Sequence, residues 1–140
     1  MFDENIGVFV TGDTGVYVAK NIKHFNEAGL GPLLSKNLSE AGYVLPTLVQ
    51  RHVIPIILAG RDLMACVPSG TGKTAAFLIP IIQRLLCSIR RSGVNPATLQ
   101  AQVLVIAPTT GEVLQIYDEA KKLTKGSSII TQQPVIVVSF

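Results

Sequence analysis

Val67-Pro68-Ser69-Gly70-Thr71-Gly72-Lys73-Thr74 is the stretch that decides how this chain is expected to fold. The apolar run 63–66 precedes it, and the pattern of a long helix, Ala75-Ala76-Phe77-Leu78-Ile79, follows it. A strand, a glycine-bearing loop with Gly-Lys-Thr and a helix, in that order, are typical of a phosphate-binding loop. The strict pattern has Gly where this chain has Val67. The alternative is an ordinary glycine-containing turn before a helix, and the flanking strand and helix patterns favour the phosphate loop.

Each residue type in this loop has a physical role in holding phosphate. Gly70 and Gly72 can adopt positive φ angles, so that the backbone N–H groups of residues 69–72 point into one concavity. The helix that begins near Lys73 adds the positive end of its dipole. The Lys73 ammonium can reach the β- and γ-phosphates, and the Thr74 hydroxyl can hold Mg²⁺. The sequence therefore predicts a nucleoside triphosphate site with Mg²⁺ at Thr74.

The composition indicates one domain with an unusually apolar content. A chain of 140 residues forms at most one domain around a single core. Its net charge of +3 suits a polyanionic partner but is too small to indicate one. A hydrophobic content of 48% and a mean hydropathy of +0.44 indicate either parallel strands buried on both faces or membrane insertion. Charged pairs such as Arg61-Asp62 and Arg90-Arg91 interrupt the apolar stretches too soon for a bilayer, so no membrane partner is expected.

The first residues and the two cysteines bear on location. Met1-Phe2-Asp3-Glu4-Asn5 lacks the basic start and apolar core of a signal peptide. Cys66 and Cys87 have no metal-ligand spacing and indicate no disulfide framework, so both are expected to be buried, reduced thiols. A cytoplasmic or nuclear location follows.

Strand and helix patterns alternate along the chain. Residues 1–22 are expected to form an N-terminal arm or a small hairpin, and residues 23–140 the folded domain. Leucines recur at helical spacing between Leu30 and Ala41, with Gly42 as the C-terminal cap. Further helices are predicted from the N-cap Thr47 to about Leu58, from 74 to 89 with a kink or irregular turn at Pro80, and from 112 to about 125. Strands are predicted at 63–67, 102–107 and 135–140, and the last of these is expected to leave an adhesive edge. This order predicts an α/β fold, a parallel sheet with flanking helices.

Two further stretches, taken with the phosphate loop, resemble a known family. Gly42-Tyr43-Val44-Leu45-Pro46-Thr47-Leu48-Val49-Gln50 is similar to the Q motif of DEAD-box RNA helicases, and Phe25 stands at that family's place for an isolated upstream aromatic. The stretch 65–77 is similar to the family's motif I, and Pro108-Thr109 with 115–120 resembles its motif Ia region. The resemblance covers about residues 23–140 and is strongest for the Vasa-type branch. It implies part of a RecA-like P-loop NTPase lobe that binds ATP, Mg²⁺ and RNA.

The resemblance also assigns roles to single residues. Gln50 is expected to select adenine, since a glutamine amide offers the donor and the acceptor that match N7 and the N6 amino group of the base. Phe25 is expected to stack on the base. The alternatives are a helix-surface amide for Gln50 and a core aromatic for Phe25. The residues assigned to nucleotide are Phe25, Tyr43, Gln50, Ser69, Gly70, Thr71, Gly72, Lys73 and Thr74, and those assigned to RNA are Pro108 and Thr109.

Several departures from the family pattern shape the functional prediction. Leu48 and Pro68 replace the usual Pro and Gln, and Thr110-Gly111 replaces an Arg-Glu pair, which puts RNA affinity in doubt. The sequence contains neither the Asp-Glu-Ala-Asp motif nor Ser-Ala-Thr, and it has no second lobe. We therefore expect part of an ATP-dependent RNA helicase that binds ATP without hydrolysing it by itself. The alternatives are a degenerate interaction protein that no longer binds nucleotide, and, less favoured, a small nucleotide kinase.

Overall fold

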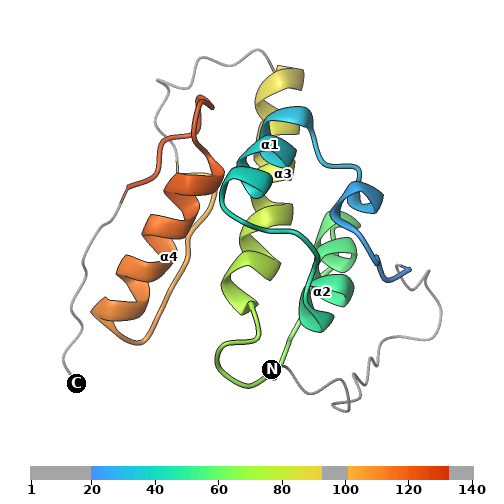
Figure 1. Ribbon diagram of the computed structural model, residues 1–140. Helices are drawn as coiled ribbons and strands as arrows, with labels where there is room; N and C mark the ends of the chain where they lie inside the picture. The colour runs from blue at the N-terminus through green and yellow to red at the C-terminus, as the bar shows by residue number, and fades with distance from the viewer. Residues whose placement is uncertain (1–19, 93–100, 133–140) are drawn as a thin grey trace.

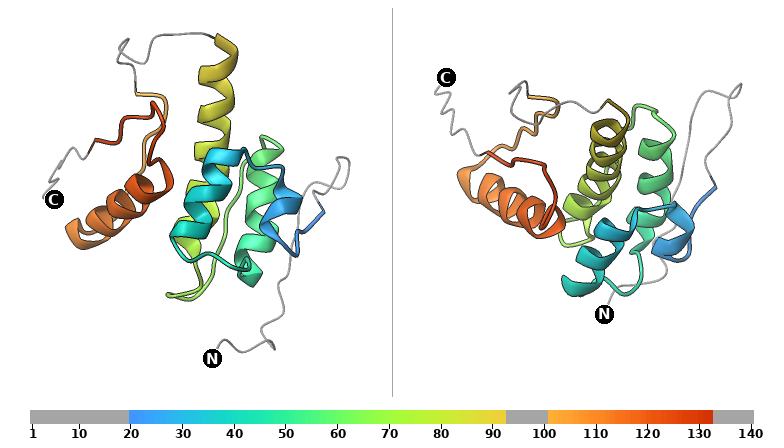
Figure 2. Two further views of the ribbon diagram at one scale, coloured as in Figure 1. Left: turned by 45° about the horizontal axis from the view of Figure 1, so that its top comes forward. Right: turned by 90° about the horizontal axis from the view of Figure 1, so that it is seen from above.

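The computed structural model describes residues 20–92 and 101–132, and over these ranges it consists of helices joined by coil (Figure 1). The elements in chain order are a 3₁₀ helix η1 (Phe25–Ala28) and the α-helices α1 (Pro32–Glu40), α2 (Leu48–Leu58), α3 (Lys73–Ser92) and α4 (Thr110–Leu123). Helix α3 lies between α2 and α4, and α1 packs against both α3 and α4 (Figure 2). The four predicted α-helices are confirmed, with small shifts of their ends.

Local sequence explains where the helices begin and end. The Thr47 side chain accepts a hydrogen bond from the backbone N–H of Gln50, and the Gln50 side chain accepts one from the N–H of Thr47, which is a capping box at the start of α2. Gly42 has a φ of +86°, and the N–H groups of Gly42 and Tyr43 donate to the carbonyls of Ser39 and Leu38 at 3.1 and 3.0 Å. These bonds form the Schellman motif that ends α1, as expected for the glycine cap.

Helix α3 is the centre of the core. Its inward face buries Ala75, Leu78, Ile79 and Ile82 against leucines of α1 and α4 and against Ile54 of α2. The helix continues without interruption through Pro80, whose side chain is fully buried, so the irregular turn predicted there is not observed. Ile22 is also part of this core, although the sequence analysis placed it at the end of the N-terminal arm. A second, smaller apolar cluster of Val49, Val53 and Ala76 lies between α2 and α3, so two clusters hold the described residues together.

The predicted parallel sheet is not found among the described residues. The segments 63–67 and 102–107 are coil, and their apolar side chains face solvent: Met64 is 95% exposed, Leu104 76% and Ile106 85%. Both segments are apolar, but a strand exists only when a neighbouring backbone completes its hydrogen bonds. Here the two segments do not pair, so their composition alone does not make them strands. The predicted strand 135–140 and the hairpin or arm before residue 20 lie outside the described residues.

Two other expectations concern the surface. Cys66 and Cys87 are both exposed, which corrects the prediction of buried thiols. Cys66 is exposed because the predicted strand around it has no sheet to enter, and Cys87 because it lies on the outward face of α3. None of the helices in the described part of the chain combines the length and the apolar character that crossing a membrane requires.

Candidate nucleotide-binding site

The loop before α3 contains two glycines in the left-handed region. Gly70 and Gly72 have φ angles of +78° and +84°, the left-handed values that the sequence analysis assigned to them. The Thr71 hydroxyl donates to the carbonyl of Pro68 at 2.8 Å, which closes a tight turn between them. The Lys73 ammonium is exposed and donates to the carbonyl of Val67 at 3.2 Å. This bond joins the first residue of α3 to the first residue of the loop. A cationic side chain and the N-terminus of a long helix therefore lie at one exposed turn, which suits a phosphate group.

Gln50 is joined directly to this loop. Its side chain is almost completely buried, with 1% exposed, and its Nε2 donates to the carbonyl of Gly72 at 3.1 Å. Its Oε1 accepts from the backbone N–H of Thr47 at 3.0 Å. Both ends of this buried amide are therefore engaged, one by the loop and one by the cap of α2. Gln50 is therefore neither a helix-surface amide nor separate from the phosphate loop.

Thr47 makes a second link that the sequence analysis did not assign to the site. Its hydroxyl donates to the carbonyl of Thr71 at 2.9 Å while it also caps α2. The capping-box pattern Thr-x-x-Gln was readable in the sequence, but it gives no hint of a contact with a loop 24 residues away. Together, Thr47 and Gln50 fasten the start of α2 to two successive carbonyls of the loop.

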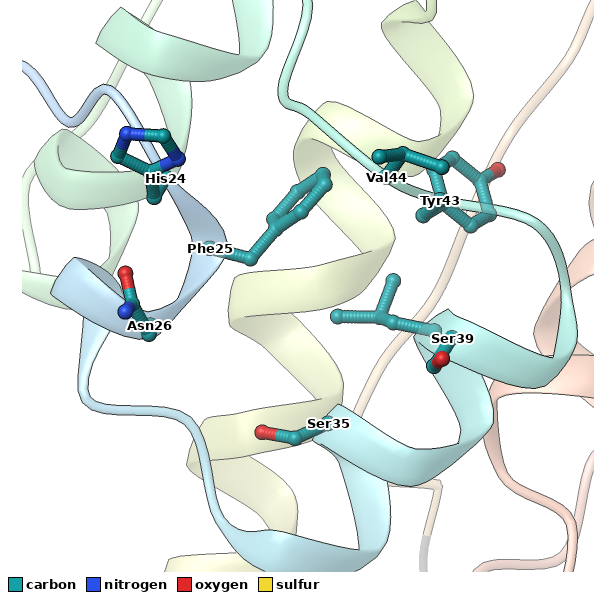
Figure 3. Close-up of a pocket in the computed structure, with 8 residues that line it drawn as sticks. His24, Phe25, Asn26, Ser35, Ser39, Tyr43 and Val44 are labelled. Carbon is teal, nitrogen blue, oxygen red and sulfur yellow. The ribbon is translucent and has the colours of Figure 1, made fainter.

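Phe25 and Tyr43 lie together in a different part of the surface. Their ring centroids are 6.2 Å apart with the ring planes at 89°, an edge-to-face pair. Both line a cavity of about 280 Å³ between η1, α1 and the segment after it, in which the Phe25 ring projects toward Tyr43 and Val44 (Figure 3). The other lining residues are His24, Asn26, Ser35, Leu38 and Ser39. Neither Gln50 nor any residue of the phosphate loop lines this cavity, so the described contacts form two clusters rather than one.

The Tyr43 hydroxyl contacts helix α4. It donates a hydrogen bond to Oε1 of Glu119, 76 residues later in the chain. Burial, and then the hydrogen bond to Glu119 and its negative charge, raise the pKa of Tyr43 above its ordinary value. The phenol is therefore a neutral donor at physiological pH. Sequence reasoning missed Glu119 because nothing in a linear pattern joins the two positions.

Pro108 and Thr109, the residues assigned to RNA, are exposed at the start of α4. The Thr109 hydroxyl accepts from the backbone N–H of Glu112 at 3.2 Å and donates to the Glu112 carboxylate at 2.9 Å. Thr109 is thus the N-cap of α4, and its hydroxyl is engaged within its own helix. The helix begins two residues earlier than predicted because this cap includes Thr110 and Gly111 in the first turn.

The metal assignment rests on Thr74 alone. Thr74 is half-buried in the first turn of α3, beside Lys73. Within residues 20–92 and 101–132, no group of three or more His, Cys, Asp or Glu side chains could hold a metal ion by itself. A Mg²⁺ ion in a phosphate site is usually held by one or two carboxylates together with water and substrate phosphates. At Thr74, one hydroxyl would supply the protein's share, and the other ligands would have to come from water and a nucleotide.

The sequence matches a family of known function. The model of the family described as DEAD/DEAH box helicase matches residues 47–136. Among curated proteins, the chain is 41% identical over 124 residues to the probable ATP-dependent RNA helicase DDX4 of Pelophylax lessonae, covering 89% of this chain and 17% of that protein. It is 42% identical over 121 residues to the ATP-dependent RNA helicase vasa of Drosophila melanogaster, covering 84% of this chain and 17% of that protein. The chain thus spans about a sixth of the length of these relatives.

Solved structures agree with this match. The RNA helicase Prp28 from Chaetomium thermophilum, in a crystal structure bound to ADP, is similar with a TM-score of 0.63 and 39% identity, over 74% of this chain and 24% of that one. A DEAD box protein from the hyperthermophile Methanococcus jannaschii is similar with a TM-score of 0.65 and 28% identity, over 76% of this chain and 27% of that one. About three quarters of this chain is therefore similar in fold to solved structures of this family.

Proposed function

This chain belongs to the DEAD/DEAH box helicase family, and from that premise we propose that it binds Mg·ATP as part of an ATP-dependent RNA helicase. Residues 69–74 hold the triphosphate, with Lys73 near the β- and γ-phosphates and Thr74 as the protein ligand of Mg²⁺. Gln50 selects adenine. Phe25 and Tyr43 are assigned to the base by the family resemblance alone, because the cavity that they line includes neither Gln50 nor the phosphate loop. The likeness to solved helicase domains supports a RecA-like lobe, and a parallel sheet within it remains part of the proposal.

The contact between Gln50 and Gly72 is the observation that carries this proposal. The residue expected to read the base donates to the carbonyl of the loop expected to hold the phosphates, at 3.1 Å. The residue assigned to the base, Gln50, and the loop assigned to the phosphates are therefore in direct contact. The buried amide is paired at both ends, with the loop and with the cap of α2, which supports an ordered loop in this chain.

RNA contact is the second part of the proposal, and it is weaker. Pro108 and Thr109 are exposed, and RNA can reach the backbone there, but the Thr109 hydroxyl is occupied by Glu112. We propose weak RNA binding at this end of α4 and no hydrolysis of ATP by this chain alone. The identity with the vasa protein supports the Vasa-like branch and a cytoplasmic or nuclear location.

A thermal-shift comparison of Mg·ATP, Mg·GTP and no nucleotide tests this function. At a ligand concentration of a hundred times Kd, binding should stabilise the fold by about 2.7 kcal/mol. We expect stabilisation by ATP, a smaller effect of GTP, and neither effect in Lys73→Ala. Within residues 20–92 and 101–132 the Lys73 ammonium makes one hydrogen bond, to a loop carbonyl, so this variant should still fold. No shift with millimolar Mg·ATP, or an equal shift in the variant, would favour the interaction protein instead.

A further inference from the structure

The segment before α4, residues 101–107, is an apolar stretch that pairs with no other segment among the described residues. It is coil, and no backbone hydrogen bond joins it to another segment within residues 20–92 and 101–132. In Figure 1 it is the light-orange trace that descends to the start of α4. An unpaired apolar stretch of backbone is a template for a strand from another chain.

The exposed fractions along this segment alternate as they do in an extended strand. Val103 and Val105 are 39% and 38% exposed, whereas Leu104 and Ile106 are 76% and 85% exposed. A period of two residues means that successive side chains point to opposite sides of the backbone. The segment therefore already has the extended form that strand pairing needs, so that pairing requires little further ordering.

The order of residues in this segment is nearly the same in both directions. Ala-Gln-Val-Leu-Val-Ile-Ala, residues 101–107, has Leu104 at its centre, a valine on each side of it and an alanine at each end. When two such stretches run antiparallel about a twofold axis at Leu104, each Leu104 faces the Leu104 of the second copy. Each Val103 then faces Val105 of the second copy, and the alanines at the two ends face each other. The strongly exposed side chains of both copies lie on one face of the pair, and the valines lie on the other.

The charge and the end of the segment also suit a second copy of this chain. Residues 101–111 contain no charged side chain, so an antiparallel copy meets no like charge along the ladder of hydrogen bonds. Pro108 follows directly after the segment and has no backbone N–H, so the ladder ends there. A twofold pair of this kind uses the same edge of both copies and closes on itself as a dimer.

We propose that residues 101–107 are a self-association surface, at which two copies of this chain pair as antiparallel strands about a twofold axis at Leu104. This surface goes beyond the proposed function and does not depend on nucleotide binding. A single ladder of this length is small beside the roughly 1,200–2,000 Å² that a stable interface buries. The dimer is therefore weak and in reversible equilibrium with the monomer.

Sedimentation velocity of the full chain over a range of concentrations tests this surface. The native chain should show a monomer–dimer equilibrium. Leu104→Lys puts two ammonium groups opposite each other at the axis, so the dissociation constant of the dimer should rise about tenfold or more. Leu104→Glu should weaken the dimer in the same way. Leu114→Lys, at an exposed apolar position on α4, is the matched control and should leave the equilibrium unchanged.

A mixture of the two charged variants makes the result specific to the axis. Each lysine then faces a glutamate, so the mixture should form the dimer again, and only an axis at Leu104 brings this residue opposite its own counterpart. The Leu104 side chain is largely exposed, so both variants should keep the Tm of the native monomer.

Four results would overturn the proposal. They are a native chain that stays monomeric at every concentration, a dimer that persists in both charged variants, association that continues beyond the dimer, and a mixture no more dimeric than its components. Infrared spectroscopy adds a further check, because strand content should rise with the concentration of the native chain. Strand content that is independent of concentration would show that the segment pairs within its own chain instead.

Discussion

The amide of Gln50 and the carbonyl of Gly72 meet at 3.1 Å, and the same carbonyl accepts the N–H of Ala76, also at 3.1 Å. The first hydrogen bond of α3 and the link to α2 therefore share one oxygen, with both of its lone pairs in use. Thr47 adds a parallel bond to the neighbouring carbonyl of Thr71. The shape of the phosphate loop thus depends on the packing of α2. A substitution in the loop or at the start of α2 should therefore alter the conformation of the loop and the stability of the fold.

The two glycines of the loop should respond differently to substitution by alanine. Both have positive φ, which costs a residue with a side chain about 1–2 kcal/mol. At Gly70 the added Cβ meets nothing within 4 Å, whereas at Gly72 it would lie 2.5 Å from Nε2 of Gln50 and 3.2 Å from the Thr47 hydroxyl. We expect Gly72→Ala to lower the free energy of unfolding by clearly more than Gly70→Ala, measured by urea denaturation. Equal losses of unfolding free energy in the two variants would mean that the Gln50 side chain moves away from the added Cβ without loss of stability.

Substitutions of Gln50 should affect both stability and base selection. Gln50→Ala leaves the N–H of Thr47 without its acceptor and should cost about 1–3 kcal/mol in the free energy of unfolding. It should also remove the preference for ATP over GTP while phosphate binding persists. Gln50→Glu is the matched variant: it keeps the acceptor for Thr47 and loses the donor to Gly72. Equal affinities for ATP and GTP in the native chain would show that Gln50 does not read the base.

Asn37 should be important for the position of α4. Its buried amide donates to two carbonyls at the end of that helix, where the helix dipole is negative. Asn37→Asp replaces these donors by a carboxylate facing carbonyl oxygens, and we expect a loss of about 1–3 kcal/mol or more in the free energy of unfolding. Ser39→Ala, an exposed position on the same helix, is the control and should change little. Thermal unfolding followed by circular dichroism would measure both.

Tyr43 predicts a specific dependence of stability on alkaline pH. Its pKa in the folded chain is raised by burial and by Glu119, so the neutral phenol is favoured by folding. The contribution is complete below the ordinary pKa of about 10 and is lost as the pH rises above that value, because only the unfolded state then loses the proton. The Tm of the native chain should therefore fall more steeply above pH 10 than that of Tyr43→Phe. Parallel curves for the two proteins would contradict a buried, hydrogen-bonded phenol.

We expect no RNA-stimulated ATP hydrolysis by this 140-residue chain. Its sequence lacks the acidic motif that holds Mg²⁺ and the arginine finger, and the latter alone is worth on the order of 10³–10⁵ in rate. The measurement is phosphate release with Mg·ATP and single-stranded RNA, with Lys73→Ala as the control. Release above that control would require a carboxylate from this chain, with Asp118 as the first candidate, since Glu119 is engaged by Tyr43 and Lys122.

The sequence by itself determined the helices, their caps and the glycine loop. These features depend on neighbours in the chain. The Thr47 side chain caps α2 through the backbone N–H of Gln50, three residues later, and Gly42 ends α1 by its own φ angle. Gly70 and Gly72 likewise shape the turn that contains them. The assignment to a helicase family likewise rested on contiguous motifs. The helical spacing between Leu30 and Ala41 includes Leu34 and Leu38, and both are buried. Ala41, from the same pattern, is exposed.

Tertiary structure alone decided which segments pair and which side chains form hydrogen bonds across the fold. The segments 63–67 and 102–107 have the composition of strands but lie unpaired, because a strand needs hydrogen bonds from another backbone that its own residues cannot supply. For the same reason no pattern could reveal that Tyr43 meets Glu119, or that Asn37 caps a helix 86 residues away. Such bonds join groups whose separation along the chain is large and whose distance in space is set by the packing of α1, α3 and α4.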